Sequence, residues 1–96
     1  MGIEELLKEM RGEILRISRK HGVGRVRIFG SVARSEATED SDIDLLIDIE
    51  GPPPPWFPGG LVADLEALLG RRVDVVEPEA IREGMRSNIL KEAMNL

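Results

Sequence analysis

The sequence predicts one α/β domain, residues 1–96, in which helices flank a small mixed sheet. Apolar residues recur every three or four positions in some segments, which is typical of amphipathic helices. In other segments they alternate with polar residues or form short β-branched runs, which is typical of strands. A chain of 96 residues suits one modest hydrophobic core. The expected order is helix, strand, short helix, strand, helix, strand, helix.

The first half of the chain should supply two helices and two strands. A first helix is expected from Gly2 to about Lys20, because its apolar residues lie at helical spacing. Alternation over Arg25–Phe29 predicts a strand, and a short helical turn should follow from Val32 to about Glu36. A second strand is expected over Asp42–Ile49, with four residues on one face: Ile43, Leu45, Ile47 and Ile49.

The second half opens with a proline-rich loop, Gly51–Gly60, because proline lacks an amide donor and fixes its own backbone. This loop either docks a partner through exposed aromatics or is a connector whose Trp56 and Phe57 fold back onto the core; we favour the connector. A helix then ends at Gly70, a strand covers Arg71–Glu77, and Pro78 should begin a final helix with three apolar residues four apart: Ile81, Met85 and Ile89.

Composition limits the chemistry that the chain can perform. Cysteine is absent and His21 is the only histidine, so disulfides, thiolate catalysis and cysteine or histidine zinc sites are excluded. Any metal must be bound by oxygen, which points to Mg²⁺ or, as an alternative, Mn²⁺. No apolar run approaches a membrane span of about 20 residues, and the N-terminus lacks a signal-peptide layout, so we expect a cytoplasmic protein without a membrane partner.

Charge is divided between two adjoining segments. Residues 11–34 contain seven basic and one acidic residue, a net charge of +6, and residues 36–50 contain seven acidic and no basic residues, a net charge of −7. The chain as a whole carries −5, which disfavours stable direct binding of nucleic acid. A basic segment beside an acidic one suits a metal-bound polyphosphate, although an alternately charged solvated surface would give the same distribution.

Three carboxylates are candidates for a metal site. Asp42 and Asp44 should lie on the same face of a strand, roughly 6–7 Å apart at Cα, whereas Asp48 lies roughly 13 Å further along and is expected to be solvated. Asp74 interrupts an otherwise apolar strand and completes a triad if the two strands are neighbours. The alternative for Asp74 is an ion pair with Arg71 or Arg72.

A glycine step precedes these carboxylates. Gly30-Ser31 follows a predicted strand, where glycine lets a ligand approach the backbone and the turn behind it aims free N–H groups outward. A glycine after a strand is often simply a turn. Its position about a dozen residues before a D-x-D strand favours a phosphate cradle.

Three motifs together resemble the polymerase-β-type nucleotidyltransferase superfamily. They are G-S-x-A-R at Gly30–Arg34, S-D-I-D-L at Ser41–Leu45, and the lone aspartate of V-D-V at Val73–Val75. The ending LGRRVDVVEPEAIRE is similar to that of the minimal nucleotidyltransferase branch, whose members act as antitoxins beside HEPN-domain ribonuclease toxins. The sequence departs from the family at Ser35, where glycine is common.

The resemblance implies a role for each matched residue. Gly30 and Ser31 would grip ATP, Asp42 and Asp44 would hold two Mg²⁺ ions, and Asp74 would hold the ion on the nucleophile side and help to deprotonate the acceptor. Arg34 would contact phosphate; an ion pair with a neighbour such as Glu36 is the favoured alternative for this residue.

The implied function is Mg²⁺-dependent transfer of AMP from ATP to a hydroxyl, typically of a tyrosine, on a HEPN toxin. The residues offer no second domain to clamp an acceptor, so we expect a bound protein partner to provide that surface. The alternative is a non-catalytic antitoxin that neutralises its partner by binding alone. The complete set of three aspartates with Gly30-Ser31 favours the enzyme.

Overall fold

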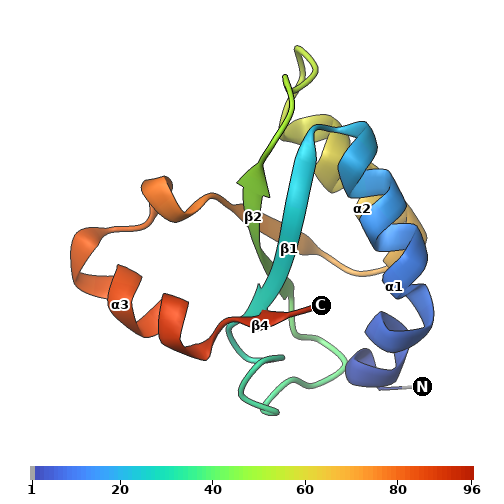
Figure 1. The fold of residues 1–96 in the computed structure, drawn as a ribbon. Helices are drawn as coiled ribbons and strands as arrows, with labels where there is room; N and C mark the ends of the chain where they lie inside the picture. Colours follow the sequence, from blue (N-terminus) through green and yellow to red (C-terminus); the bar gives the residue numbers. More distant parts are fainter. Residues whose placement is uncertain (1) are drawn as a thin grey trace.

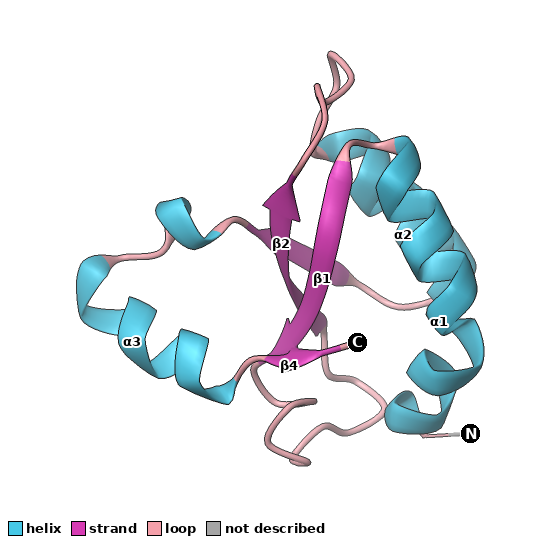
Figure 2. Cartoon of the chain, viewed as in Figure 1, coloured by secondary structure: helices cyan, strands magenta, loops and turns pink. Residues whose placement is uncertain are grey.

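The computed structural model describes residues 2–96. This range forms three α-helices and a four-stranded sheet. Figures 1 and 2 show the helices flanking the sheet. The elements in order are α1 (Ile3–Lys20), β1 (Val23–Phe29), β2 (Ile43–Ile49), α2 (Gly59–Leu69), β3 (Val73–Val76), the 3-10 helix η1 (Pro78–Ala80), α3 (Glu83–Glu92) and β4 (Met94–Asn95). No helix within this range is long and apolar enough to cross a membrane.

The sheet is mixed, as the sequence predicts. Its strand order is β3-β2-β1-β4; β2 and β3 run parallel, and β1 runs antiparallel to both β2 and β4. The parallel pair needs a crossover connection, and α2 provides it. Helices α1 and α2 lie side by side on one side of the sheet, and α3 lies on the other side (Figure 1).

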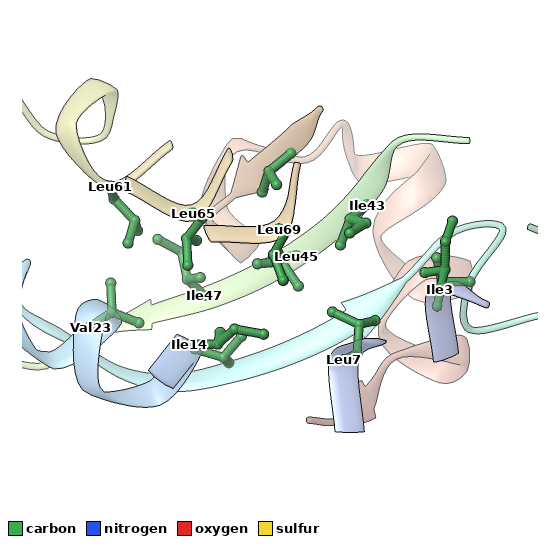
Figure 3. Packing of buried hydrophobic residues seen from close by; sticks show 13 residues of the cluster. Ile3, Leu7, Ile14, Val23, Ile43, Leu45, Ile47, Leu61, Leu65 and Leu69 are labelled. Carbon is green, nitrogen blue, oxygen red and sulfur yellow. The ribbon is translucent and has the colours of Figure 1, made fainter. Parts of the chain in front are cut away.

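The main core lies between β2 and the helix pair. Ile43, Leu45 and Ile47 point toward α1 and α2, because alternate residues of a strand share a face. Figure 3 shows these side chains packed with Leu61, Leu65 and Leu69 of α2 and with residues of α1. The intervening residues of β2, Asp44, Leu46 and Asp48, therefore point to the opposite face, on the side where α3 lies.

The end of the chain differs from the sequence prediction. The final helix is interrupted, because Ile81 and Arg82 adopt extended backbone between η1 and α3. This break allows the Ile81 side chain to be buried, while α3 itself buries no residue. The two-residue strand β4, which pairs Ile28 with Met94, was not predicted.

Two other predictions need correction. The segment after Gly30 forms hydrogen-bonded turns rather than a short helix, and Ser35 has a φ of 59° that ends any helical run. Phe57 packs against the core as expected, but Trp56 is 83% exposed. Neighbouring side chains of a tight turn point in different directions, so only one of the two aromatics reaches the core.

The core placement predicts unequal effects for two leucines on helices. Leu65→Ala should lower the free energy of unfolding by about 3 kcal/mol, because it leaves a cavity beneath α2. Leu90→Ala on α3 should cost less than about 1 kcal/mol, since Leu90 is 39% exposed. Urea denaturation of both variants measures the difference. Equal losses would contradict a core that excludes α3.

Candidate active site

Asp44 and Asp74 are direct neighbours across two strands. In the parallel pairing of β2 with β3, Asp44 is the register partner of Asp74. Paired residues of adjacent strands lie about 4.8 Å apart and point to the same face. The sequence prediction was conditional on these two strands being neighbours, and the register confirms that they are.

Two hydrogen bonds hold β3 in this register. The Val73 amide donates to Glu66 Oε2 of α2 at 2.9 Å, and the Ile43 amide donates to the Arg72 carbonyl at 2.9 Å. Asp74 follows Val73 directly, so the α2 carboxylate that anchors Val73 also positions Asp74. Sequence reasoning missed Glu66, because a glutamate on a helix is ordinarily solvated.

Asp42 lies immediately before β2 and forms a weak ion pair with Arg72. Arg72 Nε is 3.8 Å from Asp42 Oδ1, and the Arg72 side chain is 85% exposed, so the pair contributes little stability. Arg71 donates instead to the Glu39 carbonyl. Within residues 2–96, neither arginine forms an ion pair with Asp74, so the alternative interpretation of Asp74 does not hold here.

The three carboxylates interact electrostatically at Asp44. Partial burial raises the pKa of the Asp44 carboxyl above its ordinary value, and the negative charges of Asp74 and Asp42 raise it further. Arg34 opposes these effects, while Glu92 of α3 adds to them. A cation bound at Asp44 would therefore relieve repulsion among these carboxylates.

Gly30 packs directly against this carboxylate. It follows β1 with a φ of 75°, a left-handed conformation that side chains disfavour, and a Cβ atom here would collide with Asp44 Oδ2. Phe29, one residue earlier, is the register partner of Asp44 in the β1–β2 pair. Glycine therefore suits this position in two ways: it adopts the left-handed backbone without strain, and it leaves the Asp44 carboxylate room beside the turn.

The turn after Gly30 carries the remaining predicted residues. Ser31 is partly buried in it, and Arg34 pairs with Glu36 at 2.8 Å and with Glu92 at 3.1 Å. The predicted Arg34–Glu36 pair is confirmed. Ser35 adopts the left-handed conformation that glycine takes most easily, and its hydroxyl donates to Glu4 Oε1 at 3.2 Å.

Glu92 is a residue of this site that sequence reasoning did not find. Its carboxylate accepts a hydrogen bond of 2.6 Å from the Gly30 amide, besides the ion pair with Arg34. It comes from α3, 62 residues further along the chain, and no motif in the sequence marks it. Only the folded chain brings it to the glycine turn.

The donor set suits a hard divalent cation, because it consists of carboxylate oxygens and their charges already oppose one another at Asp44. Over the described part of the chain, no three histidine, aspartate or glutamate side chains are arranged as a ready ligand cage. Asp42, Asp44 and Asp74 would therefore need to reorient, or share a cation with oxygens of a ligand, to bind it together.

The raised pKa of Asp44 predicts an opposite stability effect for two matched variants. When a folded-state pKa lies above the unfolded value, stability is lost as the pH rises through it, so ionised Asp44 destabilises the fold at pH 7. In a chelator, Asp44→Asn should therefore raise the melting temperature by a few degrees, and this gain should vanish below about pH 3, where aspartate is protonated.

The control for this experiment is Asp48→Asn, on the same strand and face. Asp48 pairs with Arg27 at 3.4 Å, so its neutralisation should slightly lower the melting temperature at pH 7. A lower melting temperature for Asp44→Asn would contradict the electrostatic strain at this site.

Comparisons with known proteins agree with this arrangement. A family model described as a nucleotidyltransferase domain matches residues 7–96. The protein adenylyltransferase MntA of Thermococcus cleftensis is 36% identical over 92 residues, which cover 96% of this chain and 93% of that protein. A solved structure described as a minimal nucleotidyltransferase is 43% identical with a TM-score of 0.83, covering 96% of this chain and 94% of that one.

A more distant structure shares the fold alone. It is a toxin-antitoxin crystallised with AMP-PNP, 17% identical, with a TM-score of 0.72 over 88% of this chain and 69% of that one. The family model, the relative from Thermococcus cleftensis and the structure at 43% identity agree. The chain belongs to the nucleotidyltransferase domain family, among the minimal nucleotidyltransferases of the MntA type.

Proposed function

We propose that this nucleotidyltransferase is a cytoplasmic antitoxin that transfers AMP from ATP to a hydroxyl, typically of a tyrosine, on a partner HEPN ribonuclease toxin. The observation that carries the proposal is the pairing of Asp44 with Asp74 beside Gly30. The proposal is supported because carboxylate oxygens are suitable ligands for a divalent cation, and a glycine turn next to them leaves space for phosphate.

Each residue has a distinct task in this reaction. Gly30 and Ser31 bind the phosphates of ATP through the backbone amide and the hydroxyl, and Arg34 adds positive charge. Asp42 and Asp44 would hold two Mg²⁺ ions, with Asp74 as a further ligand on the acceptor side; Mn²⁺ is an alternative. The ions, when bound, stabilise negative charge on the attacking and leaving oxygens.

The transfer breaks the phosphoanhydride bond between the α- and β-phosphates of ATP and forms a phosphoester bond to the acceptor oxygen. The acceptor oxygen attacks the α-phosphorus of ATP, the bond from that phosphorus to the bridging oxygen breaks, and pyrophosphate leaves. A tyrosine hydroxyl has an ordinary pKa of about 10, so it gains from losing its proton as it attacks. We assign acceptance of that proton to Asp74; its exposure and the absence of an ion pair to it among residues 2–96 support this role.

The partner assignment is supported by the neighbours named above. The relative from Thermococcus cleftensis is named a protein adenylyltransferase, and the toxin-antitoxin structure was obtained with an ATP analogue. The added AMP would place bulk and negative charge beside the RNA-cutting site of the toxin. Like-charge repulsion would then weaken RNA binding, which is how the modification would neutralise the toxin.

The test compares two aspartates on one strand. With Mg²⁺, ATP labelled at the α-phosphate and a lysate of the source cell, wild type should label one protein band, and Asp44→Asn should reduce labelling at least about a hundredfold. Asp48→Asn, on the same face but paired with Arg27, should label that band like wild type. Circular dichroism of all three chains checks that each remains folded.

Other outcomes of this experiment identify other functions. Label in RNA would replace the protein acceptor by a nucleic acid. Absence of label, with the chain still retaining its partner in a pull-down, would favour an antitoxin that acts by binding alone. Full activity of Asp44→Asn would reject the carboxylates as the catalytic group.

A further inference from the structure

A carboxylate already contacts the phosphate cradle, by which we mean the turn Gly30–Arg34 that is proposed to bind the phosphates of ATP. Glu92 Oε2 accepts a hydrogen bond from the Gly30 amide at 2.6 Å, and both Glu92 oxygens lie near Arg34 Nη1, at 3.1 and 3.2 Å. The Glu92 side chain is 25% exposed, so it is partly buried beside the turn. The Glu92 carboxylate thus accepts hydrogen bonds from both the Gly30 amide and the Arg34 guanidinium.

These contacts are the ones that a phosphate oxygen would make. Carboxylate is planar and phosphate is tetrahedral, but the oxygens of both anions accept hydrogen bonds from backbone amides and guanidinium groups. The two anions therefore compete for the same donors. A phosphate at the Gly30 amide and Glu92 in its present position would place two anions at one donor. Repulsion between them excludes simultaneous occupancy.

We propose that Glu92 is an internal phosphate mimic that closes the cradle, and that the terminal phosphates of a nucleotide must displace it to bind. The inference rests on the proposed function, since it assigns Gly30 and Arg34 to the same triphosphate. It adds a residue that controls access to the site: Glu92 keeps the turn ordered and Arg34 neutralised until a polyphosphate arrives.

Displacement requires rotation of the side chain rather than departure of the helix. The segment just after Glu92 is fixed, because β4 pairs with β1 and Arg11 Nε donates to the Leu96 carbonyl at 2.9 Å. The C-terminal end of α3, which continues into β4 in Figure 1, therefore stays beside the turn, where Glu92 meets the Gly30 amide. Its side chain is partly exposed, so it can turn toward solvent while Arg34 transfers to the incoming phosphate.

Removing the charge of Glu92 should strengthen polyphosphate binding. Inorganic tripolyphosphate, titrated calorimetrically without divalent cations, should bind Glu92→Gln about tenfold more tightly than wild type, a change of ~1.4 kcal/mol. The glutamine retains the size of glutamate, but it neither pairs with Arg34 as an ion nor repels phosphate.

Glu36→Gln is the matched control. Glu36 also pairs with Arg34, at 2.8 Å, and its substitution removes the same charge, but its carboxylate is not the one bonded to the Gly30 amide. This variant should bind tripolyphosphate within about twofold of wild type, since an exposed ion pair contributes little. Equal tightening in both variants would reduce the effect to net charge and overturn the specific role of Glu92.

An NMR measurement tests the contact without any ligand. The ¹⁵N–¹H resonance of Gly30 should shift strongly in Glu92→Gln and stay near its wild-type position in Glu36→Gln. An unmoved Gly30 resonance in Glu92→Gln would overturn the inference whether or not the chain transfers AMP.

The titration can also overturn the inference. Equal tripolyphosphate affinities of wild type and Glu92→Gln would do so, while leaving the proposed function standing. If tripolyphosphate bound neither wild type nor Glu92→Gln, the turn at Gly30 would be rejected as a phosphate site, and the proposed function would be rejected with it.

Discussion

The close approach of Gly30 to the Asp44 carboxylate is the constraint on which the rest of this site depends. Because no Cβ intervenes, the turn after β1 lies directly against β2. The Gly30 amide and the Arg34 guanidinium both contact the Glu92 carboxylate, and the Asp44 carboxylate lies against Gly30. A larger residue at position 30 would strain the left-handed backbone of the turn and displace the Asp44 carboxylate from its present position beside it.

The fold tolerates this concentration of charge because its stability comes from the opposite face. Ile43, Leu45 and Ile47 are buried against α1 and α2, so β2 is held by its apolar face while its other face carries the aspartates. Asp44 remains electrostatically strained, with a raised pKa caused by burial and by Asp74 and Asp42. A carboxyl whose pKa is raised by burial and by neighbouring carboxylates is a candidate for a functional site.

The local sequence pattern was enough to predict β1, β2, β3, α1, α2 and the candidate aspartates, because apolar periodicity distinguishes helices from strands and strand alternation dictates which residues share a face. It was also enough to place Gly30-Ser31 ahead of them. The sequence pattern could not predict contacts between distant segments. The Glu66 side chain accepts a hydrogen bond from the Val73 amide, and Glu92 of α3 accepts one from the Gly30 amide. The break at Ile81 and the strand β4 likewise depend on tertiary packing rather than on local preference.

The most direct measurement is a crystal structure of the chain with AMP-PNP and Mn²⁺, using anomalous scattering to locate the cations. We expect Mn²⁺ between the nucleotide phosphates and the carboxylates of Asp42 and Asp44, with a phosphate oxygen bonded to the Gly30 amide. Nucleotide bound elsewhere on the surface, or Mn²⁺ away from these aspartates, would contradict the assignment of this sheet face as the catalytic site.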